Sequence, residues 1–294
     1  MRVTSQLLGG AVYPEAPRWR DGELWFSDMF AGKVIAVTEL GRSRVVASVP
    51  ARPSGLGWLP DGRLLVISMQ DRQLLRLDPS GLQQVADLCS LAKGELNDMV
   101  VSKQGVAYIG STGVDATDQA QLDEWAEVAF SGEAPALGNI VSVGPAGEAR
   151  VVAEAMCGPN GMVITPDHKT LLVAETSGNR LTALDIEPDG SLSGRRVFAD
   201  LPNRMPDGIC LDAEGYVWVG CPFSQEFLRV GEGGEIVDRI ALPGRLGVAC
   251  MLGGADRRTL FLATAEATVE DLMQGNSKGY IETVRVDVPG AGFP

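Results

Sequence analysis

Four polar side chains occupy one position of an internal repeat, and together they have the chemistry of a metal site. Each lies seven or eight residues before a turn that joins two short apolar segments; they are Glu15, Asn97, Asn160 and Asp207. Carboxylate and amide oxygens, with no thiolate or imidazole nearby, are typical ligands of a hard cation such as Ca²⁺ or Mg²⁺. Three or four such ligands plus waters would serve Ca²⁺, which accepts irregular geometry.

Each of these residues also has a simpler explanation. Asn160-Gly161 and Asp207-Gly208 are common turn dipeptides, Asn97-Asp98 could begin a loop, and Pro14-Glu15 could be a kinked strand edge. The shared position favours a site over four unrelated turns. Burying polar side chains without partners is costly, so their convergence needs a ligand or an ion.

The repeat predicts the elements that would position these side chains. Its turns recur at intervals of 40, 43, 63, 47 and 42 residues, marked by Gly22, Gly62, Gly105, His168, Gly215 and Arg257. A four-stranded propeller blade occupies about 40 to 50 residues. We therefore expect an all-β, six-bladed β-propeller over 1–294 as a single domain, with residues 3–8 pairing with 280–288 to close the ring. The first strand of each blade lines the central channel, which would gather the four polar residues, Ser54 and Ala249 at one end.

The third interval is about 20 residues longer than a blade requires. The excess lies at about 114–138 and contains the segment 123–130, which has short helical character. A lid over the channel and a plain surface loop are both compatible with this insertion.

Composition excludes several classes of function. The chain has 294 residues, a net charge of −13 and no basic cluster, which argues against nucleic acid and membrane as partners. One histidine excludes metal sites built on several imidazoles. Five cysteines without a CxxC motif do not form a disulfide framework, and no secretory or membrane-spanning segment is present, so we expect a cytoplasmic protein. The oligomeric state is left open.

Four motifs in order resemble the regucalcin (senescence marker protein) and gluconolactonase family. They are Glu15-Ala16-Pro17-Arg18-Trp19, Leu96-Asn97-Asp98, Pro159-Asn160-Gly161-Met162 and the run 206–215 that begins Pro206-Asp207-Gly208. The resemblance extends from about residue 12 to 265. It implies a six-bladed propeller that binds one divalent cation, most simply Ca²⁺ with Mg²⁺, Mn²⁺ or Zn²⁺ as alternatives, and that hydrolyses a small-molecule lactone.

The resemblance also implies roles for individual residues. Glu15, Asn160 and Asp207 match the metal ligands, and Asn97 matches a residue that contacts substrate. Asp207 is also a candidate general base, because the chain offers no suitable histidine. The predicted function is metal-dependent opening of a lactone or related cyclic ester. The alternatives are the same site acting on another electrophile, such as an organophosphate ester or a hydration or isomerisation substrate, and a non-enzymatic calcium-binding propeller.

One position departs from the family pattern. Animal members carry an arginine two residues before the matched Asn97, where this chain has Glu95. With Trp58, Phe30 and Phe223 as expected rim residues, the exchange favours a less polar lactone.

Three further carboxylates have expected roles of their own. Asp98 is a further candidate for substrate contact. Asp28 and Glu175 end second strands of blades. Solvation of the carboxylate is the favoured role for these two residues, and support of a neighbouring site residue is the alternative.

Overall fold

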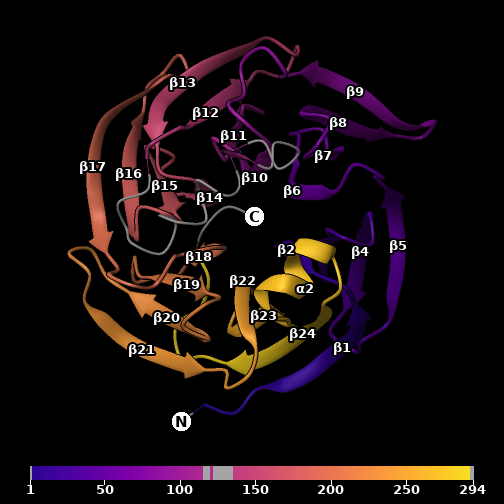
Figure 1. Cartoon of the computed structure of the whole chain (residues 1–294), viewed down its shortest axis with the longest axis vertical. Helices are drawn as coiled ribbons and strands as arrows, with labels where there is room; N and C mark the ends of the chain where they lie inside the picture. The colour runs from indigo at the N-terminus through magenta and orange to yellow at the C-terminus, as the bar shows by residue number, and fades with distance from the viewer. Residues whose placement is uncertain (1, 115–119, 122–134, 292–294) are drawn as a thin grey trace.

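Six four-stranded antiparallel sheets surround a central axis, which confirms the predicted six-bladed β-propeller (Figure 1). The computed structural model describes residues 2–114, 120–121 and 135–291. Most of the 114–138 insertion, including the expected lid segment 123–130, lies outside the described residues.

The strands follow one another outward from the axis in blades 1 to 5. Blade 1 comprises β2 (Pro14–Arg20), β3 (Glu23–Asp28), β4 (Lys33–Thr38) and β5 (Ser43–Ser48). Blade 2 comprises β6 (Pro53–Trp58), β7 (Leu64–Ser68), β8 (Gln73–Asp78) and β9 (Gly81–Asp87). Blade 3 comprises β10 (Leu96–Val101), β11 (Ala107–Ser111), β12 (Gly138–Val143) and β13 (Ala149–Met156). Blade 4 comprises β14 (Pro159–Ile164), β15 (Thr170–Glu175), β16 (Arg180–Ile186) and β17 (Leu192–Asp200). Blade 5 comprises β18 (Ile209–Leu211), β19 (Val217–Cys221), β20 (Glu226–Val230) and β21 (Ile236–Ala241).

Blade 6 joins the two ends of the chain. It comprises β22 (Leu246–Gly253), β23 (Thr259–Glu266), β24 (Lys278–Arg285) and, as its outer strand, β1 (Ser5–Ala11). The pairing of Ser5 with Thr283 and of Gly9 with Tyr280 confirms the predicted closure. Arg2 extends it, because its guanidinium donates to Asp238 of blade 5 at 2.9 Å.

The turn positions that defined the repeat behave alike. All six adopt a left-handed backbone, with φ of 81°, 87°, 83°, 62°, 83° and 57° from Gly22 to Arg257 in chain order. Four of the six are glycine, the residue that adopts this conformation without strain. The shared geometry explains why a turn signal located each blade so well.

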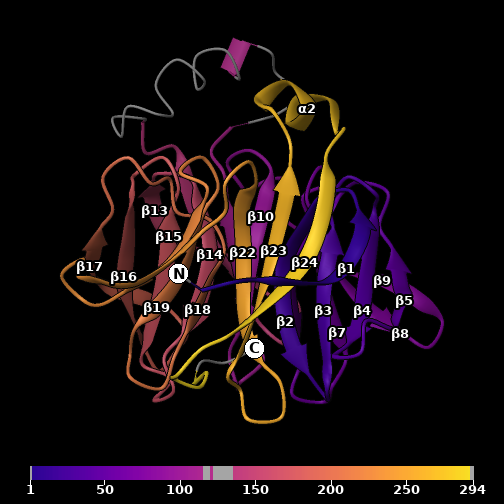
Figure 2. The same cartoon turned by 90° about the horizontal axis from the view of Figure 1, so that it is seen from below.

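The two ends of the channel differ. The innermost strands begin at the face that carries α2 (Val269–Gln274), and the chain's C-terminal segment crosses the opposite end (Figure 2). There Ala291 N donates to Leu211 O at 3.1 Å and Gly290 N to Arg257 O at 2.9 Å. A cavity of about 20 Å³ lies above this segment, bordered by Arg18, Met162 and Gly290 among others. That volume suffices for about one water.

The helices described here do not include one that is long and apolar enough to cross a membrane.

Candidate metal and active site

Glu15, Asn97 and Asn160 lie where the innermost strands leave regular pairing. Register shifts occur between Glu15 and Arg18 in β2, between Leu96 and Met99 in β10, and between Pro159 and Met162 in β14. Asp207 lies two residues before β18, and its N–H donates to Gly220 O at 2.8 Å. Bulges redirect side chains at the ends of strands, and here they occur at one phase of the repeat. The sixth position is the buried, apolar Ala249.

Asn160-Gly161 and Asp207-Gly208 are not turn dipeptides. Neither glycine has a positive φ. A Cβ on Gly161 would lie 2.6 Å from Asp207 O, and one on Gly208 would lie 2.2 Å from Ala249 Cβ. These glycines are required because adjacent innermost strands approach closely at this level, which brings the polar residues of neighbouring blades together.

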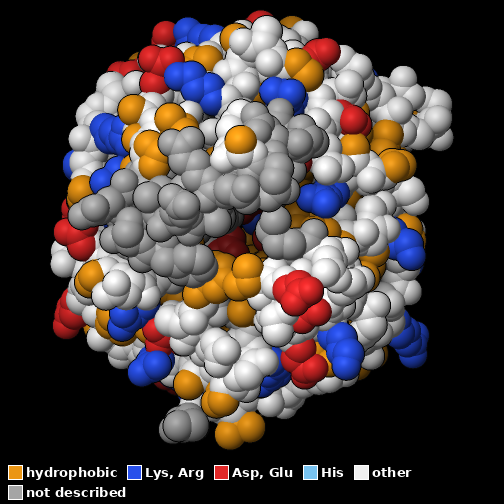
Figure 3. All heavy atoms as spheres, viewed as in Figure 1, with side chains coloured by type: hydrophobic (Ala, Val, Ile, Leu, Met, Phe, Trp, Pro, Cys, Tyr) orange, Lys and Arg blue, Asp and Glu red, His pale blue; other side chains and the backbone are white. Residues whose placement is uncertain are grey.

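Buried carboxylates repel one another at this end of the channel. Burial raises the pKa of Asp207 to about 8, and the Asp98 carboxylate adds to the rise while Asn160 and the Gly208 backbone oppose it. Burial also raises the pKa of Glu15 well above its usual range, with Asp207 and Asp98 contributing. Figure 3 shows acidic atoms deep in a hollow near the middle of this face. Burial and crowding therefore disfavour the ionised carboxylates in the metal-free protein, and a bound cation would stabilise the ionised form.

The two asparagines are held in different ways. Asn160 uses its Nδ2, which donates to Thr176 Oγ1 at 3.1 Å, and Thr176 in turn donates to Pro206 O at 2.8 Å. Asn97 uses its Oδ1, which accepts from Ser54 Oγ at 3.2 Å. The arrangement leaves an amide oxygen of Asn160 available as a ligand and the amide N–H group of Asn97 available as a donor.

These side chains fit a hard divalent cation. Oδ1 of Asp207 is buried and accepts no hydrogen bond from any residue that the structure describes. Two carboxylates and an amide oxygen form the donor set that Ca²⁺ or Mg²⁺ prefers. Within the described ranges, no three His, Cys, Asp or Glu side chains are grouped as a metal site. A cation held here would take the oxygen of Asn160 in addition to the two carboxylates.

Asp98 is paired with a buried arginine. Arg18 Nη2 lies 3.1 Å from Asp98 Oδ1 and donates to Met99 O at 2.6 Å, and both side chains are nearly inaccessible. Met99 N also donates to Asp98 Oδ1, at 3.0 Å. These contacts give the buried Asp98 carboxylate partners inside the protein. Contact between Asp98 and a substrate stays a prediction.

Removing Arg18 should destabilise the metal-free protein. Arg18→Met leaves the Asp98 carboxylate buried without its counter-charge, which costs about 3–5 kcal/mol of unfolding free energy. The double variant Arg18→Met/Asp98→Asn should recover much of that loss, as measured by urea unfolding. Arg285→Met, which breaks an exposed pair with Asp256, is the control and should leave the free energy of unfolding nearly unchanged. Equal losses for the two single variants would contradict this account.

Two of the three expected rim residues lie on the α2 face. Phe30 follows β3 and Phe223 follows β19, so both lie on the α2 face, and Phe223 is 40% exposed. Glu95 is largely buried and its backbone bonds to Thr112 and Val114.

Trp58 requires a correction. It ends β6 at the opposite face, where its ring lies 5.5 Å from that of Trp25 and 5.0 Å from the Arg20 guanidinium. Trp58 is thus part of the blade interior and does not line the mouth.

Sequence reasoning missed Tyr13. Its phenol is buried, and burial together with the Asp207 and Glu15 carboxylates raises its pKa well above the usual range. Its ring lies 5.4 Å from Phe30. Tyr13 stands two residues before Glu15, as Glu95 stands two residues before Asn97. That shared position in the repeat is the signal that would have found it.

Comparisons with known proteins agree with the motifs. Residues 13–266 match the model of the SMP-30/Gluconolactonase/LRE-like region. The chain is 24% identical to 6-deoxy-6-sulfogluconolactonase of Pseudomonas putida over 97% of this chain and 94% of that protein. Its fold matches a luciferin-regenerating enzyme with a TM-score of 0.81 at 18% identity, covering 99% of this chain and 98% of the other. It also matches a calcium-binding protein, regucalcin, from Agrobacterium tumefaciens with a TM-score of 0.74 at 22% identity, covering 99% and 97%. The chain belongs to the SMP-30/gluconolactonase/LRE-like family, which confirms the resemblance seen in the sequence.

Proposed function

We propose that this protein is a divalent-metal-dependent hydrolase that opens a lactone or related cyclic ester. The observation that carries the proposal is the pair of buried carboxylates, Glu15 and Asp207, with raised pKa values. One Asp207 oxygen, beside Asn160, has no hydrogen-bond partner among the described residues. These three residues would hold the cation. The relative named as a sulfogluconolactonase supports the lactone, and the neighbour described as calcium-binding supports Ca²⁺, with Mg²⁺, Mn²⁺ and Zn²⁺ as alternatives.

The residues of the chain divide the remaining work. When bound, the cation supplies a Lewis acid that polarises the carbonyl of the lactone and makes a water molecule more acidic. Asn97 presents its amide N–H group to a substrate oxygen, because its Oδ1 is already engaged by Ser54. Asp207 accepts a proton from the attacking water and passes it to the ring oxygen as that oxygen leaves. The new C–O bond forms as the ring ester bond breaks, which gives a hydroxy acid and, at neutral pH, releases a proton.

Proton release from a lactone panel tests this proposal. The metal-stripped protein would be assayed on sugar, alkyl and aromatic lactones with and without added Ca²⁺, Mg²⁺, Mn²⁺ or Zn²⁺. Metal-dependent turnover of any lactone is the expected result. Cation binding without turnover of any lactone would move the proposal to another electrophile at the same site.

Arg52 occupies the same position of the repeat as Glu95 and Tyr13, and it carries a positive charge. It precedes Ser54 by two residues, has a left-handed φ of 64°, and holds its guanidinium 5.2 Å from the Phe30 ring. It forms no ion pair within the described part of the chain. The sequence favoured a less polar lactone because of Glu95, but Arg52 favours a lactone with an anionic substituent, as the name of the Pseudomonas relative also suggests.

Arg52→Ala should therefore raise KM about 10-fold for lactones that carry a carboxylate or sulfonate, and leave neutral lactones unchanged. Arg44→Ala removes a comparable stack on Trp25 from the outer strand of blade 1 and serves as the control. Steady-state kinetics on paired neutral and anionic lactones would measure the effect. An equal change for both kinds of lactone would contradict it.

The five cysteines are all free thiols. This supports a reducing compartment, such as the cytoplasm, as the place of action.

A further inference from the structure

Two buried carboxylates occupy the same place in two blades. Asp28 is the last residue of β3 in blade 1, and Glu175 is the last residue of β15 in blade 4; they are 3% and 0% exposed. Solvation at a strand end was the favoured expectation, and their burial shows that it is wrong. Blades 1 and 4 are the blades that supply Glu15 and Asn160.

In blade 1, Asp28 binds the backbone just ahead of Glu15. Its Oδ1 accepts from Tyr13 N at 2.9 Å and from Val12 N at 3.0 Å, and its Oδ2 accepts from Val12 N at 3.1 Å. Met29 N donates to Tyr13 O at 2.9 Å, which ties the same segment to the strand end from the other side. The segment 12–14 is thus fixed to blade 1 just ahead of Glu15, which pairs with Ser27 and immediately precedes the bulge.

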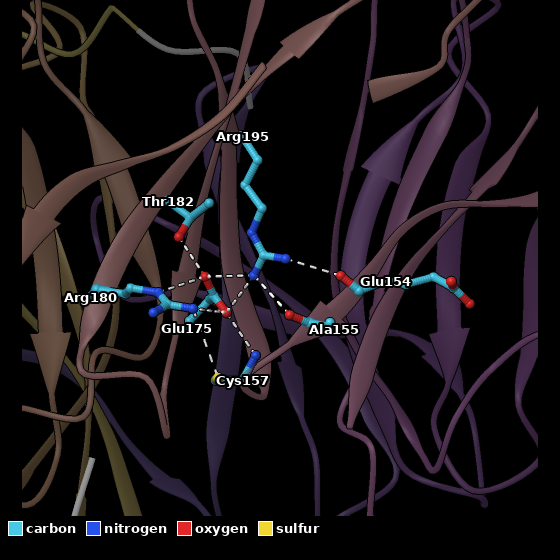
Figure 4. A network of polar contacts seen from close by, with 7 residues as sticks. All are labelled: Glu154, Ala155, Cys157, Glu175, Arg180, Thr182 and Arg195. Carbon is cyan, nitrogen blue, oxygen red and sulfur yellow. Dashed lines mark hydrogen bonds and ion pairs between the residues drawn. The ribbon is translucent and has the colours of Figure 1, made fainter. Parts of the chain in front are cut away.

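In blade 4, Glu175 binds the backbone ahead of Asn160 (Figure 4). Its Oε2 accepts from Cys157 N at 2.7 Å, and its Oε1 accepts from Arg180 Nε at 2.9 Å and Thr182 Oγ1 at 2.5 Å. Arg195 Nη2 lies 3.2 Å from Glu175 Oε2 and also donates to Ala155 O at 2.8 Å. Ala155 has a φ of 54°, a conformation that alanine rarely adopts. The contacts hold a strained segment in place.

Blades 2, 3 and 5 lack a carboxylate here, because the corresponding strands end in Ser68, Ser111 and Cys221. In blade 6, β23 ends in Glu266, which is exposed, and the buried Ala265 pairs with the first residue of the innermost strand as Asp28 and Glu175 do in their blades. Asp207 of blade 5 is instead secured directly, because its own N–H donates to Gly220 O and Gly220 N donates to Gly208 O at 2.9 Å. In blades 1 and 4 the pairing with the second strand is interrupted just after Glu15 and around Asn160, and the segments ahead of these residues are held by the Asp28 and Glu175 carboxylates.

We propose that Asp28 and Glu175 are positioning residues that fix the segments ahead of Glu15 and Asn160 and so set the affinity of the site for its cation. The inference rests on the proposed metal site. Charge-assisted hydrogen bonds to backbone N–H groups are short and strong. Ligands held in place before binding lose less freedom when the cation binds. Loss of residues that orient ligands commonly weakens metal affinity by about 10- to 100-fold.

The variants Asp28→Asn and Glu175→Gln test this proposal. In each variant an amide NH₂ group replaces an oxygen that accepts a hydrogen bond in the unaltered protein. The segment ahead of Glu15 or Asn160 therefore loses a hydrogen bond, while the size of the side chain is kept. Asp212→Asn is the matched control. Asp212 is equally buried and accepts from Glu214 N, Tyr216 N and Arg229, but it lies at the opposite end of blade 5.

Calorimetric titration of the metal-stripped full chain with Ca²⁺, and with Mg²⁺, Mn²⁺ and Zn²⁺ if Ca²⁺ does not bind, would measure the dissociation constant. We expect about 10-fold weaker binding or more for Asp28→Asn and Glu175→Gln, and less than about a 2-fold change for Asp212→Asn, although all three lower Tm. If Glu175→Gln does not fold, Thr182→Val tests the same network, because it removes one hydrogen-bond donor to Glu175. We expect it to weaken cation binding by about 3-fold. Unchanged affinity for the cation in Asp28→Asn, and in whichever of Glu175→Gln and Thr182→Val folds, would overturn this inference and leave the proposed function standing. Failure of the unaltered protein to bind any of the four cations would overturn the proposed function as well.

Discussion

Asp207→Ala is expected to abolish measurable cation binding and to lower lactone turnover by about 10³-fold or more. Asp207 combines the roles of ligand and proton acceptor in the proposed site, and its Oδ1 has no competing partner among the described residues. Calorimetry and proton-release kinetics on the same preparation would measure both effects.

Asp256→Ala provides the control for this substitution. Asp256 is an exposed carboxylate that pairs with Arg285 near the opposite end of the channel. Its variant should bind the cation and turn over substrate as the unaltered protein does. Normal turnover by Asp207→Ala would remove Asp207 from the site.

The metal-free protein should lose stability as the pH rises from about 4 to about 8. The folded-state pKa of Asp207 is about 8 against an ordinary 3.8, so the folded state binds the proton more tightly than the unfolded state. The stabilising contribution is complete below pH 3.8 and is lost as the pH rises through 8. The raised pKa of Glu15 acts in the same direction.

Urea unfolding at pH 5 to 8, with a chelator or with saturating Ca²⁺, would measure this dependence. Because cation binding requires the ionised carboxylates, added Ca²⁺ should stabilise the protein more at pH 8 than at pH 5. Asp207→Asn has no carboxyl group to titrate there, and its metal-free form should show a much flatter profile. A flat profile for the unaltered protein would show that the two carboxylates are not crowded in the absence of metal.

The repeat was the most informative part of the sequence. A left-handed turn at Gly22, Gly62 and the equivalent positions is a local requirement, so it leaves a regular trace in the chain that reveals the number of blades. The position of Glu15, Asn160 and Asp207 relative to those turns then placed them at one end of the channel. Their assignment as metal ligands stays a prediction, which the experiments above address.

Contacts between blades were not accessible in the same way. The Arg18–Asp98 pair joins residues 80 positions apart, and neither residue type indicates its partner in the sequence. Trp58 was expected at the rim together with Phe30 and Phe223. The structure places it at the other end, because the side chain of a strand's last residue lies far from that of its first.

Tyr13 and Asp28 show a related limit. The backbone N–H of Tyr13 donates a hydrogen bond to Asp28, which holds Tyr13 beside the site. Such a bond follows from the fold as a whole and leaves no signal in the sequence. A comparison of residues at the position two before each polar residue would have drawn attention to Tyr13, Arg52 and Glu95 together. It would not have shown the contacts that each of them makes.

The most direct test of the account follows lactone hydrolysis by the metal-stripped protein as Ca²⁺ is added back, alongside calorimetric binding of Ca²⁺ under the same conditions. The account predicts no turnover without metal, and a rise in activity whose half-saturation coincides with the measured dissociation constant at one site per chain. Full turnover in the presence of a strong chelator, by protein shown to be metal-free, would contradict it.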